Sequence, residues 1–215
     1  MKDFVQYVLY FHAFSGGIAL LSGLVAIFTK KGSKNHIFSG EVYFYAMLSV
    51  ILTSLFVGFY RNNIFLQTIA IFSFYLAFTG KRVLRNKQEV IVKPLDWGIN
   101  IVAMLVGFFM LYLAVINFIR VGFVGAIPML TVFGGLLSTM TIQDAVIMGR
   151  KKFNKNNWLY THIGRMGGSF VATSTAFLLT NIHFNPAWVV WLAPTLIGTP
   201  LIIVSIKKWK VKMGD

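Results

Sequence analysis

The sequence predicts an all-α, polytopic membrane protein with seven transmembrane helices in a single domain, residues 1–215. The chain is 57% hydrophobic and only 12% charged, whereas a soluble protein has about 25% charged residues. Nearly all Lys and Arg residues fall between long apolar runs, and these runs have about the length needed to cross ~30 Å of hydrocarbon. The net charge of +14 therefore indicates membrane topology rather than nucleic-acid binding.

Seven apolar segments have roughly the length of a transmembrane helix, although the third is short. They cover residues 4–29, 37–60, 64–79, 97–119, 122–148, 158–182 and 187–206. The chain has no cysteine, which excludes disulfides, thiolate metal sites and a cysteine nucleophile. The sequence indicates no second domain. The apolar composition predicts the lipid bilayer as the partner of the chain.

The basic residues fix the predicted orientation. Sixteen of them lie in alternate gaps and in the tail: Lys30, Lys31, Lys34, Lys81, Arg82, Arg85, Lys87, Lys93, Arg150, Lys151, Lys152, Lys155, Lys207, Lys208, Lys210 and Lys212. The other side has Lys2, Arg61 and Arg120. The positive-inside rule places the sixteen in the cytoplasm, with the N-terminus outside and the C-terminus inside a bacterial cytoplasmic membrane. Anionic lipid is the expected partner of these basic loops.

The first and last spans show how polar and kinking residues are accommodated. His12 shares a helix face with Ser15, Ala19, Gly23 and Ala26, so we expect it to face another helix rather than lipid. In the last span, Pro194 and Pro200 free backbone carbonyls that neighbouring threonines can satisfy.

The second, fourth, fifth and sixth spans carry polar residues near their predicted cytoplasmic ends. The set comprises Glu41, Asn100, Asp144, His162 and Arg165. Helical rise places all five within roughly 5–12 Å of the cytoplasmic interface. His36 stands at that interface, where the site would open. A charge in hydrocarbon is costly and usually faces a polar interior. The sequence therefore predicts a buried polar site here, or a structural ion pair of Arg165 with Glu41 or Asp144.

The sixth span supports an interior location. His162, Arg165, Ser169, Thr173 and Thr180 recur at helical spacing and share one face. The fifth span presents a compatible row of small and hydroxyl residues, Gly134, Ser138 and Thr141, above Asp144. In the sixth span, Gly164 and Gly168 would let a neighbouring helix approach closely.

Three chemistries fit these residues, and the sequence does not name a ligand, a reaction or an enzyme activity. The polar site could bind a small polar ligand, or a divalent metal held by His36, Glu41, Asp144 and His162, because carboxylate and imidazole suit such ions. The protein could instead be a haem b or quinone redox protein, with haem held by histidines at two levels, His12 and His183 outside, His36 and His162 inside. A proton-coupled transporter would use Glu41 and Asp144 as carriers.

Two short stretches resemble a bacterial family of multi-pass membrane proteins known only as a domain of unknown function. One is His36-x-x-x-Gly40-x-x-Tyr43, after His12 and a Gly-rich helix; the other surrounds His162. Ile37 and Glu41 replace two arginines of the family motif. The resemblance implies that His12, His36, Gly40, Tyr43 and His162 matter, and it implies no activity.

Overall fold

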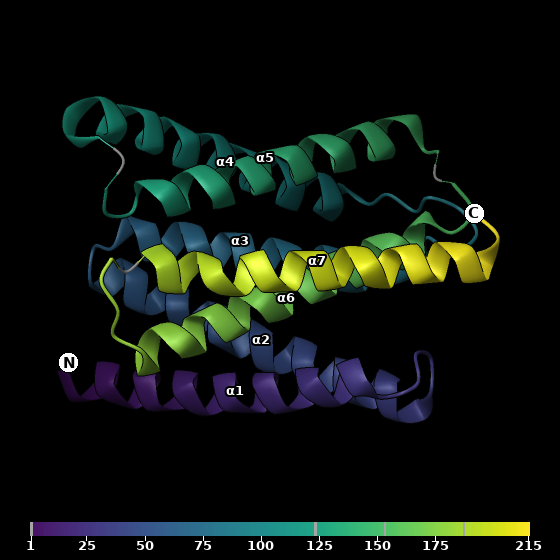
Figure 1. Ribbon diagram of the computed structural model, residues 1–215, viewed down its shortest axis with the longest axis horizontal. Helices are drawn as coiled ribbons and strands as arrows, with labels where there is room; N and C mark the ends of the chain where they lie inside the picture. The colour runs from purple at the N-terminus through teal and green to yellow at the C-terminus, as the bar shows by residue number, and fades with distance from the viewer. Residues whose placement is uncertain (1, 123, 153, 187) are drawn as a thin grey trace. The chain divides into compact units, whose positions relative to one another are not determined.

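The computed structural model describes residues 2–122, 124–152, 154–186 and 188–215, and confirms the all-α prediction over them (Figure 1). No β-strand occurs within these ranges. Seven α-helices and one 3₁₀ turn follow in order: α1 (Lys2–Phe28), α2 (Lys34–Tyr60), α3 (Ile64–Arg82), η1 (Val83–Arg85), α4 (Pro94–Val121), α5 (Ile127–Arg150), α6 (Asn157–Asn181) and α7 (Trp188–Met213).

The helices correspond one for one to the predicted spans, with differences at their ends. The last helix runs on to Met213 rather than stopping at 206. Lysines are good helix formers and are favourable near a helix C-terminus, so the helix continues past its apolar part. The fifth helix begins at Ile127 rather than 122. Gly122 and Gly125 precede it with positive φ of 76° and 59°, a conformation that interrupts a helix.

Six of the seven helices in the described part of the chain are long and apolar enough to cross a membrane. The exception is α6, whose 25 residues are sufficient in length but which carries the predicted polar stripe. The structure therefore supports a multi-pass membrane protein with at least these six candidate spans.

The chain divides into two compact units, Met1–Ala77 and Phe78–Asp215, with the boundary inside α3. We call them unit 1 and unit 2 and describe each by itself. The assignment of residues 1–215 to one domain remains a prediction.

In unit 1, α1 and α2 form an antiparallel hairpin whose turn is closed by side chains. Gly32 adopts a φ of 79°, and the Ser33 hydroxyl caps α2 by accepting a hydrogen bond from the His36 N–H. Lys31 Nζ donates to the carbonyls of Ala26 and Ile27 at 2.9 and 2.7 Å. These carbonyls end α1 and have no helical partner. Burial lowers the pKa of Lys31.

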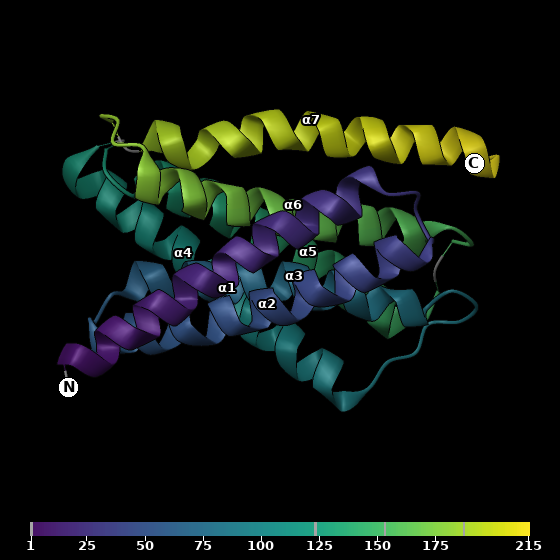
Figure 2. The same ribbon diagram turned by 90° about the horizontal axis from the view of Figure 1, so that it is seen from below.

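Unit 2 contains two helical hairpins, α4–α5 and α6–α7, whose helices approach closely at glycines (Figures 1 and 2). A Cβ added to Gly134 of α5 would lie 2.9 Å from Met110 Cβ and 3.1 Å from the Gly107 carbonyl of α4. A Cβ added to Gly198 of α7 would overlap the side chain of Val171 of α6. Small residues bring these helix backbones together, as in membrane-helix pairs generally.

Candidate functional site

A buried ion pair between α5 and α6 is the centre of the candidate site in unit 2. Arg165 Nη2 lies 3.0 Å from both carboxylate oxygens of Asp144. The exposed fractions of the two side chains are 7% and 19%. The same nitrogen lies 3.4 Å from the Met140 carbonyl. One of the two pairings predicted for Arg165 is therefore confirmed.

The end of α3 helps to position this part of α6. A Cβ on Gly80 would lie 3.0 Å from Arg165 Cβ and 2.9 Å from Met166 Sδ. The end of α3 and the start of α6 therefore come this close only because Gly80 has no side chain. His162 Nδ1 lies 2.8 Å from the Gly80 carbonyl oxygen. A carbonyl only accepts, so Nδ1 carries a proton and donates it to Gly80.

Hydroxyl and amide groups extend from the ion pair into the interior of unit 2. Asn100 of α4 is buried and donates from Nδ2 to the Thr141 carbonyl of α5 at 3.1 Å. The predicted rows are buried as well: Ser138 and Thr141 on α5, Ser169 and Thr173 on α6. Thr180 departs from the row because it is exposed, and its hydroxyl bonds to its own helix at Phe177.

The prediction that Glu41 shares a site with Asn100, Asp144, His162 and Arg165 stays a prediction, because Glu41 belongs to unit 1 and the other four residues to unit 2. Glu41 is exposed on α2. The buried face of that helix runs through Ser39, Tyr43, Met47 and Ile51, which repeat every four residues. Glu41 stands two residues from Ser39 and from Tyr43, and a rotation of about 100° per residue turns it to the other side of the helix.

The predicted metal set is divided between the two units, with His36 and Glu41 in unit 1 and Asp144 and His162 in unit 2. Within the described ranges, no three His, Asp or Glu residues lie together as metal ligands would. His36 closes the first hairpin instead, with Nδ1 2.9 Å from the Ala26 carbonyl oxygen. Asp144 is held by Arg165.

The four histidines of the haem hypothesis occupy different settings. His12 and His36 belong to unit 1, His162 and His183 to unit 2. His12 lies on the packed face of α1, as predicted, with Nδ1 2.8 Å from Thr53 Oγ1 of α2. The Thr53 hydroxyl donates to the Ser49 carbonyl, so its oxygen accepts the proton of His12 Nδ1. His183 is exposed beyond α6.

Unit 2 contains a second ion pair, which we did not predict from the sequence. Arg82, near the end of α3, donates from Nε and Nη2 to the two oxygens of Asp96 at 2.7 and 2.6 Å. The Lys93 N–H donates to Asp96 as well. Pro94 at the start of α4, followed two residues later by an acidic side chain, is a helix-start signature that could have located this carboxylate. Its partner, Arg82, lies 14 residues away along the chain, and no sequence pattern around Arg82 indicates the pairing.

Comparison with protein-family models, with curated protein sequences and with solved structures finds no match to this chain. The resemblance to the multi-pass family of unknown function remains a prediction. Of its motif residues, Tyr43 is buried on α2, and His12, His36 and His162 make the contacts given above.

Proposed function

We propose that this protein crosses a bacterial cytoplasmic membrane seven times, with its N-terminus outside. Six helices have the apolar length required. We assign the seventh crossing to α6, because its polar residues Arg165, Ser169 and Thr173 are buried and because it pairs with the apolar α7. A span can contain polar groups when they face other helices rather than lipid. The sixteen basic residues then lie on the cytoplasmic side.

The absence of native cysteine allows a direct topology test by single cysteine substitutions. A thiol reagent that does not cross membranes should label Asn62→Cys and Asn185→Cys in intact cells. It should label Lys152→Cys only after permeabilisation. Equal labelling of Lys152→Cys and Asn185→Cys in intact cells would show that α6 does not cross.

We further propose that the interior of unit 2 binds a small polar ligand at the Asp144–Arg165 pair. The observation behind this proposal is the pairing of both Asp144 oxygens with one guanidinium nitrogen at 3.0 Å, in a largely buried setting. Exchanging a buried ion pair for well-packed apolar residues is often neutral or stabilising. A pair retained at this depth is therefore more readily explained by function than by stability.

The chemistry of the pair defines the class of ligand. The planar guanidinium of Arg165 matches carboxylates and phosphates, which accept two parallel hydrogen bonds. Such an anion would compete with Asp144 for the guanidinium. The carboxylate of Asp144 would then be available to a ligand ammonium group. A small carboxylate, and in particular an amino acid, satisfies both side chains.

The test is a thermal-unfolding screen in detergent with succinate, L-glutamate and inorganic phosphate. At least one of them should raise the melting temperature of the wild-type protein. It should not do so for the Asp144→Leu/Arg165→Leu double variant. Identical responses of the two proteins to all three compounds would refute ligand binding at the pair.

Proton-coupled transport is the second candidate function, with Asp144 alone as the carrier. Hydroxyl groups of Thr141 and Ser169 are fully buried on the two helices that supply the ion pair. Protonation of Asp144 would release Arg165, which is a two-state change of the kind that transport requires. In liposomes, a pH gradient should drive uptake of the compound identified above, and Asp144→Asn should abolish uptake while leaving binding measurable.

A further inference from the structure

One end of unit 2 collects a large positive charge and little accessible negative charge. It contains the end of α3, the start of α4, the turn between α5 and α6, and the end of α7. The Arg82–Asp96 contact joins α3 to α4, and the Asn100–Thr141 contact joins α4 to α5. The α4–α5 and α6–α7 hairpins bring the remaining ends together. Three acidic residues belong to this end, Glu89, Asp96 and Asp215. Asp96 is bonded to Arg82. Asp215 accepts hydrogen bonds from Tyr160 and Asn156.

Two of the exposed lysines at this end lie over aromatic rings of α6. Lys87 Nζ is 5.1 Å from the centre of the Trp158 ring, and Lys210 Nζ is 5.4 Å from the centre of the Tyr160 ring. Both distances are within the range of a cation–π contact. The rings stand at the start of α6, so they place two ammonium groups above the same helix end.

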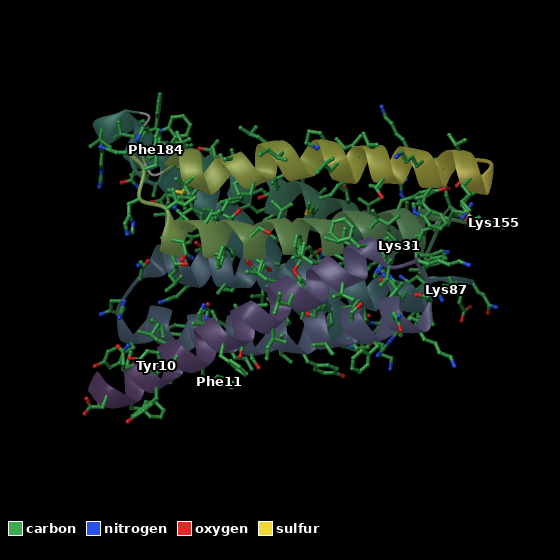
Figure 3. The ribbon with its side chains drawn as sticks, turned by 60° about the horizontal axis from the view of Figure 1, so that its bottom comes forward. Tyr10, Phe11, Lys31, Lys87, Lys155 and Phe184 are labelled. Carbon is green, nitrogen blue, oxygen red and sulfur yellow. The ribbon has the colours of Figure 1, made fainter. Side chains whose placement is uncertain are left out.

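A third lysine completes the cluster. Lys155 lies in the turn before α6 and is exposed, and it projects from the same end as Lys87 (Figure 3). Lys155 and Lys210 both act electrostatically on Asp215, so both of these lysines lie on the side of this end where Asp215 is. The Asp215 carboxylate, which accepts hydrogen bonds from Tyr160 and Asn156, offsets one of the three lysine charges, so the cluster stays positive.

We propose that Lys87, Lys155 and Lys210 bind the phosphate headgroup of an anionic phospholipid at this end of unit 2. The positive-inside rule requires basic residues here but no defined geometry. Ammonium groups held on rings at the first turns of a membrane helix do have a defined geometry. Trp and Tyr at such positions lie at the headgroup level of a bilayer, which is where the lipid phosphates are. The proposal is independent of the Asp144–Arg165 site.

The test compares two variants of equal charge. The cluster variant is Lys87→Gln/Lys155→Gln/Lys210→Gln. The control, Lys152→Gln/Lys207→Gln/Lys208→Gln, removes three exposed lysines of the same end that are not part of the cluster. Native mass spectrometry in an equimolar mixture of phosphatidylglycerol and phosphatidylcholine gives the ratio of the two bound lipids. The wild-type protein should favour phosphatidylglycerol. The control should lose about fivefold per lysine, which is the general surface attraction, and the cluster variant should lose clearly more.

Two further measurements separate the alternatives. Trp158→Leu keeps every charge but removes the ring under Lys87, and it should lower the preference for phosphatidylglycerol. Millimolar inorganic phosphate should leave the preference intact. Equal losses in the two triple variants would overturn the proposal in favour of general surface attraction, and abolition by inorganic phosphate would overturn it in favour of a soluble anion. If a triple variant does not fold, Lys155→Gln alone can be compared with one single substitution of the control set, because Lys155→Gln breaks no ring contact.

Discussion

Units 1 and 2 each join helices through buried polar groups, but with different chemistry and different packing. In unit 1 the contact is a neutral hydrogen bond from His12 to Thr53. In unit 2 it is the Asp144–Arg165 ion pair. The glycines near His12, Gly16 and Gly17, have open space around them, whereas Gly134 of unit 2 lies against the backbone of α4. Unit 2 therefore combines a close backbone approach at Gly134 with the more expensive polar contact.

The two kinds of contact differ in what they contribute to stability. A neutral pair between membrane helices contributes about 0.6 kcal/mol on average, and losing it leaves no charge behind. A buried ion pair has a large desolvation cost, and breaking it strands a charge. The following substitutions test this contrast, beginning with the largest expected effect.

Replacing Arg165 alone should be the most damaging change. Arg165→Leu leaves the Asp144 carboxylate in a largely buried setting without its guanidinium partner, and should destabilise the protein by about 3–5 kcal/mol. Arg120→Leu is the matched control, because Arg120 is exposed near the end of α4 and should change stability by about 0.5 kcal/mol or less. Denaturant unfolding in detergent measures both. Equal stability of the two variants would remove the distinction drawn between the units.

Replacing a close-packed glycine should have the next largest effect. In Gly134→Ala the new methyl would lie 2.9 Å from Met110 Cβ and 3.1 Å from the Gly107 carbonyl, so backbone must move. Overpacking of this kind costs about 1–3 kcal/mol. The adjacent Gly135 has nothing within 4 Å of an added Cβ. Gly135→Ala and, in unit 1, Gly17→Ala should therefore be neutral or gain up to about 1 kcal/mol of helix propensity.

Breaking the neutral contact of unit 1 should have a smaller effect. Thr53→Val keeps the shape of the side chain but removes the oxygen that accepts from His12. The expected loss is about 0.6 kcal/mol and at most about 1.7 kcal/mol, the range found for hydrogen bonds between membrane helices. Thr53→Ser keeps the hydroxyl and should restore most of it. A loss as large as that of Arg165→Leu would mean that the neutral contact is as important as the ion pair.

The smallest predicted effect depends on pH and lies outside the membrane. Hydrogen bonds from Tyr160 and Asn156, together with Lys210 and Lys155, lower the pKa of Asp215 below its ordinary value of 3.8. A lowered folded-state pKa stabilises the protein above the unfolded pKa, and this contribution disappears as the pH falls through the folded pKa. Asp215→Asn should therefore lower the melting temperature slightly at pH 6, and the difference should vanish towards pH 3. A difference independent of pH would show that the carboxylate charge is not involved.

The helices and their order were predictable from the sequence, because apolar runs and basic gaps follow directly from the thickness and polarity of a bilayer. The packed face of α1 and the buried rows of α5 and α6 follow from helical spacing. Pairing between helices was not predictable in the same way. Asp144 and Glu41 are equivalent as partners for Arg165 when only depth is known, because depth along a helix does not say which face of that helix packs against another.

We propose that the Asp144–Arg165 pair serves binding rather than stability, and the stability of the Asp144→Leu/Arg165→Leu double variant is the decisive test. Denaturant unfolding should find this variant at least as stable as the wild-type protein, since apolar replacement of a buried ion pair is often neutral or favourable by about 1–4 kcal/mol. The variant should also recover the stability lost in Arg165→Leu. A double variant as unstable as Arg165→Leu would contradict the claim and identify the pair as a structural brace.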